Sequence, residues 1–369
     1  MESSLGPLLP LLERERAAGR ALALGVLVHT AGSTYRKPGA LLLIARSGEY
    51  AGLLSGGCLE SDLAEHAREV IETGCARVIT YDLRDEGDLV WGLGLGCEGA
   101  MRILLLRTGP EEQWEPLAHL ASALALHAPT AVGIVTESAD AGVPVGALVL
   151  PEASGPRALP RSLSRRAQVR LTGPRVAAAL ESARRASAVG WVEESGPGWR
   201  LLLLPLSLPP RLLLLGAGPD AAPLTDLAAR QHWKVTLVDH RPARAQPSHF
   251  PLAEQVVLSR PEALAQAMDL AGFSAAVVMS HHLPSDLEYL RALAASPAPR
   301  YIGLLGPPAR RDKLLGELGS RAEMLNGRLR APVGFDLGGR TPESIALAIV
   351  AEIHAFLCGG LHRERRAHP

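Results

Sequence analysis

Short hydrophobic runs, separated by turns rich in Gly and Pro, form the pattern of residues 1–110. Such runs, bounded by turn formers, are typical of buried strands. They predict strands over residues 21–29, 39–45, 50–54, 77–81 and 100–106. Two helices are expected, over 5–19 and 59–73; in the second, Leu63 and Ala67 lie at helical spacing and Gly74 suits the C-cap. Residues 1–110 are therefore predicted to form an α/β domain.

Residues 111–208 have a less regular pattern and are expected to complete the N-terminal domain. The predicted elements are strands over 131–136, 146–150 and 200–204, a helix over 175–187 and a surface loop within 151–174. The order of a strand, a turn and a second strand that starts with Gly-Ala also occurs in the first 110 residues. Two explanations stay open, a structural repeat and a chance similarity. The Pro-rich stretch at 205–210 predicts a hinge.

The clearest local pattern starts at residue 211, where an apolar run enters a glycine-rich turn. Strand 211–215 is followed by Gly216-Ala217-Gly218-Pro219-Asp220-Ala221, a helix to about residue 231 and a strand that ends in Asp239. Such a turn, followed by an acid about 20 residues on, is typical of dinucleotide-binding folds: the glycines admit phosphates and the acid binds ribose hydroxyls. Residues 209–360 are therefore predicted to form a Rossmann-like domain.

More apolar runs extend this pattern towards the C-terminus. They predict strands over 255–258, 275–279 and 300–304, with helices between them, and a last helix from Thr341 to about residue 357. The predicted fold class is α/β, with a mainly parallel, doubly wound sheet in the C-terminal domain. Residues 361–369 are expected to be a flexible tail.

Polar side chains follow two of these strands and are candidates for a binding crevice. His281 and Asp286 follow strand 275–279, and Arg310 and Arg311 follow strand 300–304. Because open α/β sheets bind ligands at the carboxyl ends of their strands, these residues could line one crevice. The alternative is that the histidine caps a strand and the arginines are solvated. Asp220 would place a carboxylate where a pyrophosphate should lie, so nucleotide binding also stays open.

Composition narrows the class of protein. The 369 residues include 38 Lys and Arg and 38 Asp and Glu, so no net charge favours nucleic acid or an anionic membrane. The first residues lack a basic n-region, and the leucine runs are too short to span a bilayer, so we expect a cytoplasmic protein. Four cysteines without a CxxC pair make no disulfide framework, and Cys75 and Cys358 are expected to be structural.

Two cysteines stand among glycines and carry the candidate chemistry. Cys58 follows Gly56 and Gly57, and Cys97 follows Gly96. Because glycine has no Cβ, a ligand can approach such a backbone closely, and a thiol placed there stays reachable. We expect both cysteines to contact a ligand or metal. The alternative is that they are small packing residues in tight turns.

Several of these motifs together resemble the XdhC/CoxI family of accessory factors, which mature xanthine dehydrogenase and related molybdenum hydroxylases. The resemblance covers most of the chain and lies in the segments Gly32-Ser33-Thr34-Tyr35-Arg36-Lys37-Pro38-Gly39-Ala40, Ser55-Gly56-Gly57-Cys58-Leu59-Glu60, Gly94-Leu95-Gly96-Cys97, Tyr301-Ile302-Gly303-Leu304-Leu305-Gly306, Ala331-Pro332-Val333-Gly334 and Thr341-Pro342-Glu343.

The resemblance implies a dimeric, non-catalytic protein that binds molybdenum cofactor. It would protect the cofactor while a cysteine desulfurase partner supplies the terminal sulfido ligand, and would then deliver it to the apo form of a molybdenum hydroxylase. Cys58, Cys97 and their glycines would contact the molybdenum and the pterin, and the candidates in the C-terminal domain are Gly216, Gly218, Asp239, His281 and Arg310.

Two other classes of function remain possible from the residues alone. The glycine turn would suit an NAD(P)-dependent oxidoreductase, although no Ser-Tyr-Lys constellation for hydride transfer accompanies it. Cys58 with His281 as its base would suit a cysteine-nucleophile enzyme.

Overall fold

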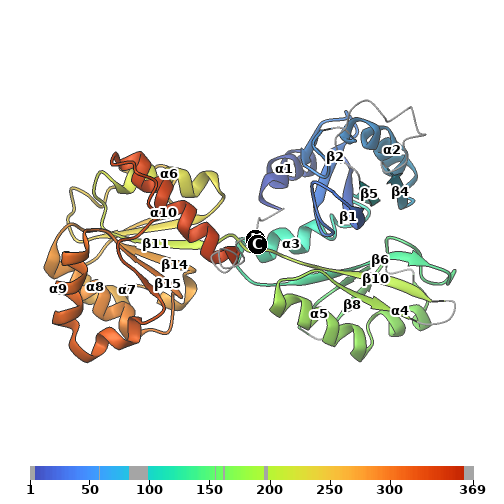
Figure 1. Ribbon diagram of the computed structural model, residues 1–369. Helices are drawn as coiled ribbons and strands as arrows, with labels where there is room; N and C mark the ends of the chain where they lie inside the picture. Colours follow the sequence, from blue (N-terminus) through green and yellow to red (C-terminus); the bar gives the residue numbers. More distant parts are fainter. Residues whose placement is uncertain are drawn as a thin grey trace, which may run out of the picture. The chain divides into compact units, whose positions relative to one another are not determined.

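The computed structural model describes residues 5–57, 59–82, 99–153, 155–160, 163–194 and 198–360. The candidate residues Cys58, Gly96 and Cys97 and the predicted tail at 361–369 lie outside these ranges. The chain divides into two compact units, residues 2–208 and residues 209–369, here called the N-terminal unit and the Rossmann unit (Figure 1).

The first half of the N-terminal unit is an antiparallel sheet with helices. Its elements are α1 (Leu9–Ala17), β1 (Leu22–Gly32), β2 (Leu41–Ala45), β3 (Tyr50–Gly52), α2 (Glu60–Thr73), β4 (Arg77–Asp82) and β5 (Gly99–Thr108). The strand order is β3-β2-β1-β5-β4. The predicted strands and both helices are confirmed here, and Gly74 ends α2 with a φ of +71°, as its role of C-cap requires.

The second half of the N-terminal unit has the same topology. Its elements are α3 (Leu117–Ala125), β6 (Ala131–Ser138), β7 (Leu148–Leu150), β8 (Arg157–Leu159), α4 (Arg165–Leu171), α5 (Pro174–Ala186), β9 (Gly190–Glu193) and β10 (Trp199–Pro205). The order β8-β7-β6-β10-β9 equals that of the first sheet with every strand number raised by five. The unit is thus a structural repeat, one of the two explanations left open by the sequence. Besides loop residues, the segment 151–174 contains β8 and α4, which the sequence did not predict.

Backbone hydrogen bonds show how closely the two halves correspond. The amide of Gly39 donates to the carbonyl of Leu27, and the amide of Gly146 donates to the carbonyl of Val135. Both glycines are left-handed, with φ of +95° and +85°, which glycine adopts at no steric cost. The Gly-Ala pair at the start of the second strand therefore marks the same type of turn in both halves.

The same two glycines mark reciprocal contacts between the halves. A Cβ on Gly39 would lie 2.6 Å from Cγ2 of Val189, which precedes β9, and a Cβ on Gly146 would lie 2.6 Å from Cβ of Ala76, which precedes β4. The turn of each half thus packs on the equivalent strand start of the other half. Such exchanged contacts are typical of a pair related by a pseudo-twofold axis.

The core of the N-terminal unit lies between its two sheets. One face of β1, with Leu22, Leu24 and Val26, packs in the same cluster as Ile134 and Leu202 of the second sheet. The opposite face of the first sheet packs on α2, and that of the second sheet packs on α4 and α5. Because both faces of every central strand are buried, these strands are continuous apolar runs and do not alternate with polar residues.

The Rossmann unit is a parallel sheet covered by helices on both faces. Its elements are β11 (Arg211–Leu215), α6 (Ala221–Arg230), β12 (Lys234–Asp239), β13 (Gln255–Leu258), α7 (Leu264–Ala267), β14 (Ala275–Val278), α8 (Leu283–Ala295), β15 (Tyr301–Leu304), α9 (Pro308–Leu318), β16 (Leu329–Arg330) and α10 (Pro342–Leu357). In the strand order β13-β12-β11-β14-β15-β16, the chain builds the sheet outwards from β11 on one side and from β14 on the other. Parallel sheets bind ligands at such a switch point, at the carboxyl ends of the strands.

Alternate residues of β11 point to opposite faces of the sheet, and each face is covered by helices. Leu212 and Leu214 pack in a cluster with residues of α6 and α10, whereas Leu213 and Leu215 pack with residues of α7, α8 and α9. The last helix begins as predicted, because the side chain of Thr341 accepts a hydrogen bond from the amide of Ser344.

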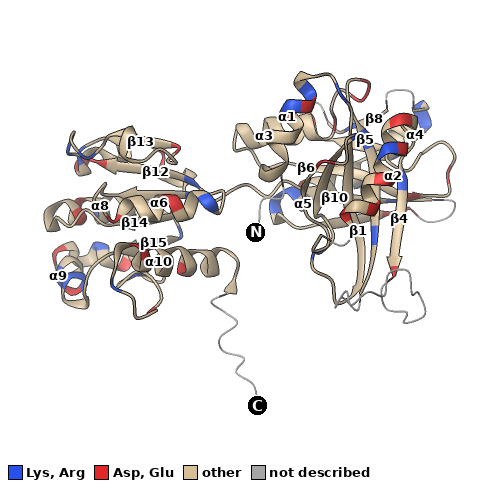
Figure 2. Ribbon diagram, turned by 90° about the horizontal axis from the view of Figure 1, so that it is seen from above, with Lys and Arg blue, Asp and Glu red and all other residues tan. Residues whose placement is uncertain are grey.

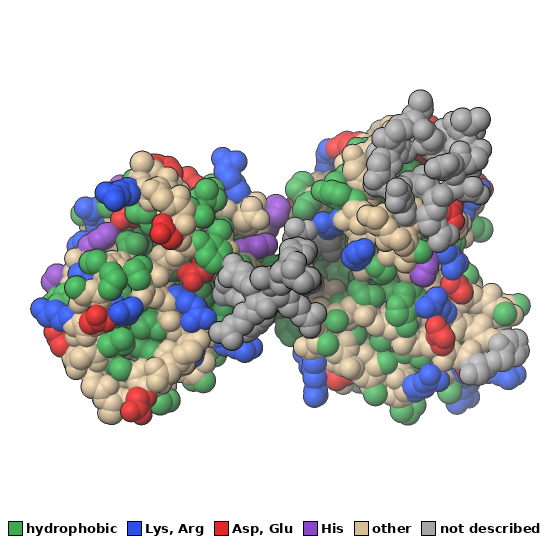
Figure 3. Space-filling view, viewed as in Figure 1, with side chains coloured by type: hydrophobic (Ala, Val, Ile, Leu, Met, Phe, Trp, Pro, Cys, Tyr) green, Lys and Arg blue, Asp and Glu red, His purple; other side chains and the backbone are tan. Residues whose placement is uncertain are grey.

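Charges of both signs are interspersed over each unit. Figure 2 shows Lys and Arg next to Asp and Glu on most helices, and the face drawn in Figure 3 has the same mixture. Within the described part of the chain, no helix is both long enough and apolar enough to cross a bilayer.

Candidate functional site

The loop after β1, the end of β4 and the start of β5 lie at one end of the first sheet. Gly32, the last residue of β1, pairs with Gly99, the first residue of β5, and Asp82 at the end of β4 pairs with Ala100. The loop after β1, which holds the motif 32–40, therefore lies at the same end of the sheet as Asp82 and Gly99, the described residues that flank the segment 83–98. A Cβ on Gly99 would collide with the carbonyl of Ser33, so glycine is needed for this close approach.

The start of α2 is held at the same end of the sheet. Tyr81 of β4 donates a hydrogen bond from its hydroxyl to the Asp62 carboxylate in the first turn of α2. Burial and the neighbouring Asp62 raise the pKa of Tyr81, which therefore stays a neutral donor. Because Asp82 directly precedes the segment 83–98, this bond brings the loop before α2 close to the start of that segment.

A buried carboxylate closes the loop before α2. Glu60 is fully buried, and its oxygens accept hydrogen bonds from the amides of Leu54, Ser55 and Leu59, at 3.1, 2.9 and 3.2 Å, and from the Ser55 hydroxyl. Burial alone would raise the pKa of Glu60, but the bonds from Ser55 and the backbone hold it below its usual value. Glu60 thus ties both ends of the segment 54–59 together, a role that the sequence motif did not reveal.

The described residues of this end present an open backbone and an aromatic ring. Gly56 and Gly57 are exposed, and Gly57 has a φ of +101°. Apart from chain neighbours, no atom of the described residues lies within 4 Å of a Cβ built on either glycine. Tyr35 in the loop after β1 is 64% exposed. The arrangement offers accessible peptide groups and a stacking surface, although Cys58, Gly96 and Cys97 themselves are outside the described residues.

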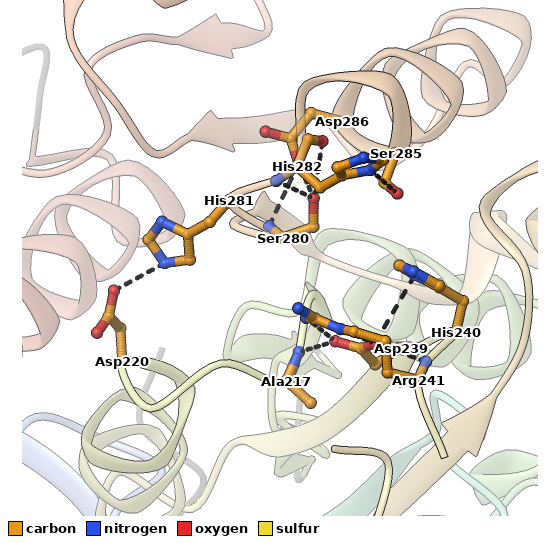
Figure 4. A network of polar contacts seen from close by, with 10 residues as sticks. All are labelled: Ala217, Asp220, Asp239, His240, Arg241, Ser280, His281, His282, Ser285 and Asp286. Atoms are coloured by element: carbon orange, nitrogen blue, oxygen red, sulfur yellow. Dashed lines mark hydrogen bonds and ion pairs between the residues drawn. The ribbon is translucent and has the colours of Figure 1, made fainter. Parts of the chain in front are cut away.

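The glycine turn of the Rossmann unit is confirmed as a strand–turn–helix. Gly216 has a φ of +125°, and a Cβ on it would lie 2.6 Å from Cα of Ser280 and 2.7 Å from the carbonyl carbon of Met279. The turns after β11 and β14 can lie this close only because residue 216 is glycine. Figure 4 shows the polar groups of these turns and of the end of β12.

These polar groups are paired with one another. Asp239 is 1% exposed, and its carboxylate accepts hydrogen bonds from the amide of Ala217 at 2.8 Å and from the Arg241 side chain at 2.6 and 2.9 Å. Although burial opposes the shift, Arg241 and these amides lower the pKa of Asp239 to about 2. Nε2 of His281 lies 2.9 Å from the Asp220 carboxylate, so this pair joins the two turns.

The pairings do not suit a dinucleotide in its usual position. A ribose would have to displace Arg241 from Asp239, and the amide of Ala217 already donates to that carboxylate. The carboxylate of Asp220 adds negative charge to the turn that would hold the pyrophosphate. The residues present thus give no support to the alternative of an NAD(P)-dependent oxidoreductase.

Arg310, another sequence candidate, binds a buried carboxylate. Its Nε and Nη2 atoms donate to Asp286 at 3.1 and 2.5 Å, and Asp286, 1% exposed, also accepts hydrogen bonds from Ser280. The three residues join the end of β14 to the starts of α8 and α9. Arg311 lies apart and donates to the carbonyl of Ala331.

A pocket lies at this edge of the sheet, where a crevice was expected, but none of the four predicted residues His281, Asp286, Arg310 and Arg311 lines it. It has a volume of about 900 Å³ and is lined by His240, Arg260, His282 and Ser285, among others. His240 follows Asp239 directly, so its place at a strand end was visible in the sequence, but the loop of Arg260 reaches the pocket only through the fold.

Metal ligands do not gather in the described parts of either unit. Among these residues, no group of three or more His, Cys, Asp and Glu could hold a metal ion. Cys75 and Cys358, which were expected to be structural, are both exposed, and neither forms a disulfide within the described residues.

Comparisons with known proteins match both units. A family model described as the XdhC Rossmann domain matches residues 212–353, and one described as the XdhC and CoxI family matches residues 15–82. A protein of Bacillus subtilis (strain 168), named as a probable subunit of xanthine dehydrogenase, is 31% identical over 343 residues, which cover 93% of this chain and 94% of the relative.

Two further matches also span nearly the whole chain. The molybdenum cofactor insertion chaperone PaoD of Escherichia coli (strain K12) is 26% identical over 353 residues, which cover 94% of this chain and 86% of the relative. A crystal structure of a xanthine dehydrogenase from Bacillus halodurans matches with a TM-score of 0.76 and 26% identity, over 100% of this chain and 98% of that one. The predicted α/β fold with a Rossmann-like C-terminal part is confirmed.

Proposed function

The chain belongs to the XdhC and CoxI family, as its motifs indicated, and from this membership we propose that it acts in the maturation of molybdenum cofactor for a hydroxylase of the xanthine dehydrogenase type. The name of the E. coli relative, a cofactor insertion chaperone, supports an accessory role and not a catalytic one. In this role the protein binds the cofactor, protects it during sulfuration and delivers it to the apo-enzyme.

The proposed binding site is the end of the first sheet that holds the motif 32–40. The observation that carries the proposal is that the motif 32–40 and the loop before α2 lie at the same end of the sheet as Asp82 and Gly99, the described residues that flank 83–98. Soft thiolates are suitable ligands for a metal already bound to sulfur, so Cys58 and Cys97 contact the molybdenum. The open peptide groups of Gly56 and Gly57 contact the pterin, and Gly96 is assigned the same role from the sequence motif.

Tyr35 adds a planar surface at this site. The exposed ring lies in the loop after β1 and can stack on the flat pterin.

In the Rossmann unit, considered by itself, the candidates for contact with a ligand are the turn residues Gly216 and Gly218 together with Asp239, His281 and Arg310. The side chains of Asp239 and Arg310 already bind Arg241 and Asp286, so their role is to hold the turns in place and not to contact a ligand directly. His281, 55% exposed, is the side chain of this group that can reach a ligand without leaving a buried partner.

The proposed partners are those that sulfuration and delivery of the cofactor require. The terminal sulfido ligand requires a sulfur donor, for which a cysteine desulfurase is the proposed partner, and the cofactor requires an apo molybdenum hydroxylase as acceptor. We place these steps in the cytoplasm, with a homodimer as the working form.

Purification from a molybdenum-replete host tests cofactor binding. The protein is oxidised, and the fluorescence of the released pterin is measured per chain. Wild-type protein and Cys75→Ala, which changes an exposed thiol elsewhere in the same unit, are expected to release pterin, and Cys58→Ala is expected to lose most of it. Equal pterin from all three proteins, or none from the wild type, contradicts the proposal.

A further inference from the structure

A different pocket of the Rossmann unit lies at the amino ends of its last two strands. It has a volume of about 550 Å³, and three arginines contribute to its lining, Arg300, Arg328 and Arg330. Arg300 directly precedes β15, and Arg328 directly precedes β16. Because the strands are parallel, this edge of the sheet is opposite to the edge with the glycine turn. The pocket is therefore distinct from the turns that hold Asp239 and His281.

The positive charges of this pocket have no carboxylate partner. Within the described part of the chain, none of the three arginines forms an ion pair, and no described lining residue is Asp or Glu. Other arginines of the unit are paired, as Arg241 is with Asp239 and Arg310 is with Asp286. Like charges gathered in one pocket repel one another, and an anion bound among them would relieve this repulsion.

Arg328 shows most clearly that a counter-charge is lacking. Its side chain is half-buried, with Nη1 donating to the carbonyl of Ser296 at 2.6 Å and Nη2 donating to the carbonyl of Leu293 at 2.7 Å. Its Nε atom is buried and has no hydrogen-bond partner among the described residues. Burial lowers the pKa of Arg328, and no carboxylate of these residues offsets the effect. The two carbonyls orient the guanidinium but do not neutralise it, and one hydrogen on each Nη atom stays available.

The backbone directs two of these side chains to the same ligand. The amide of Ile302 donates to the carbonyl of Arg328, and Gly303 is paired with Arg330, so both arginines lie along the edge of β15. Side chains two positions apart in an extended chain point to the same face. The guanidinium of Arg330 makes only a long contact of 3.4 Å, to the carbonyl of Leu329, and can turn towards a ligand.

We propose that this pocket binds a phosphate monoester, a small organic molecule that carries one phosphate group. The phosphate group has three terminal oxygens and a charge of about −1.5 to −2 at neutral pH, which suits three guanidinium groups. A carboxylate has two oxygens and a single charge, and would leave most of the positive charge uncompensated. The amide group of Asn326 supplies a further donor at the same pocket.

The rest of the lining indicates that the ligand is larger than phosphate itself. The volume of about 550 Å³ lies within the range of about 300–1,000 Å³ that is usual for small-molecule sites. Phe356 and Pro297 give apolar contact surface, and the ring of Phe356 packs on that of Tyr301, with centroids 5.4 Å apart. The organic part of the ligand is therefore assigned to the side of Phe356.

Titration calorimetry on the full chain tests the assignment, with phenyl phosphate, inorganic phosphate and benzoate as probes. Phenyl phosphate is expected to bind about tenfold more tightly than either of the other two. Arg300→Ala and Arg330→Ala are each expected to weaken this binding about tenfold. Arg244→Ala, which changes an exposed arginine in the loop after β12, is the matched control and is expected to leave it unchanged.

Three results would overturn the assignment. These are no binding of phenyl phosphate at millimolar concentration, equal affinity for phenyl phosphate and benzoate, and unchanged affinity in Arg300→Ala. Arg300 is exposed, so its removal should leave the fold intact, and circular dichroism of the variant checks this.

The pterin assay distinguishes this site from the proposed cofactor site. Because the cofactor is assigned to the N-terminal unit, Arg300→Ala should release as much pterin per chain as the wild type. Loss of pterin from this variant would assign the pocket to the cofactor and would overturn the proposal of a separate ligand. A wild-type protein without pterin would contradict the cofactor role and leave the phosphate titration valid.

Discussion

Glu60→Gln is the change that most sharply tests how the loop before α2 is held. In the wild type, Oε1 accepts from the amides of Leu54 and Ser55, and Oε2 accepts from the Ser55 hydroxyl and the amide of Leu59. Glutamine replaces one of these oxygens by an NH2 group, which donates and cannot accept. With the NH2 group in the place of Oε1, the buried amides of Leu54 and Ser55 lose their acceptor. With it in the place of Oε2, the Ser55 hydroxyl loses its acceptor, and the amide of Leu59 keeps only its bond to Oγ of Ser55. At least one buried donor is therefore left without this partner in either orientation.

The expected cost follows from the number and kind of bonds lost. A buried donor left without a partner costs about 1–3 kcal/mol, and loss of the negative charge weakens the bonds that remain. We therefore expect the loop to open more easily by about 2–4 kcal/mol, which corresponds to roughly 30-fold to 1,000-fold faster local hydrogen exchange.

Hydrogen exchange of the full chain, read by mass spectrometry on peptides covering residues 54–59, measures this directly. Glu65→Gln is the matched control, since Glu65 lies on the same helix and its side chain is 68% exposed and paired only with Arg68. Its exposed ion pair contributes at most about 1 kcal/mol, and the exchange of the loop should not change. If the loop of Glu60→Gln exchanges as slowly as that of the wild type, the carboxylate does not hold it.

Three further predictions concern stability. Gly216→Ala should destabilise the Rossmann unit by about 2–4 kcal/mol, because the added Cβ would meet backbone atoms and residue 216 has a positive φ. Gly316→Ala should stabilise the unit by about 0.5–1 kcal/mol, because Gly316 lies inside α9 with open space around its Cβ position. Chemical denaturation measures both changes, and equal effects of the two substitutions would contradict the geometry. The folded pKa of Asp239, about 2, lies below its unfolded value of about 3.9. The ionised carboxylate therefore makes its full contribution to the free energy of unfolding above about pH 4, and this contribution is lost as the pH falls from about 4 to about 2. In urea unfolding, the free energy of unfolding of Asp239→Asn should depend less on pH over this range than that of the wild type. Gly39→Ala and Gly146→Ala should each destabilise the N-terminal unit by about 1–3 kcal/mol in thermal unfolding, and a neutral result at only one of them would contradict the reciprocal packing of the repeat.

Elements with continuous apolar runs were predicted well from the sequence. Strands β11 and β13 begin and end where predicted, and α10 ends at the predicted Leu357. Their boundaries are marked by Gly or Pro or by a capping residue, so local chemistry is sufficient to define them. The predicted glycine turn after β11 is likewise a local feature.

Other elements depend on partners distant in sequence. Strand β8 has three residues, Arg157–Leu159, and exists because it pairs with β7, so no periodicity could indicate it. The helices α3 and α4 are also short and lie in a segment of mixed composition. The full repeat became visible only through its strand order, because the two halves share a turn and a topology and have few sequence motifs in common.

In the candidate site, too, some features could be predicted from local sequence and others depend on contacts between distant residues. The motif with Gly56 and Gly57 could be read from the sequence, but the role of Glu60 could not, since its partners depend on how the loop folds back. Asp239 stood where a ribose-binding acid is expected, yet Arg241, two residues later, takes the carboxylate. A basic residue so close to that acid is a signal that the sequence did contain.

The central claim is that Cys58 contributes a sulfur ligand to a cofactor bound at the N-terminal unit. X-ray absorption at the molybdenum edge, on protein purified with its cofactor, counts the sulfur atoms around the metal. In the small fraction of Cys58→Ala that keeps cofactor, the account predicts one fewer sulfur ligand per molybdenum than in the wild type, and it predicts no change in Cys75→Ala. Identical spectra for all three proteins would contradict it.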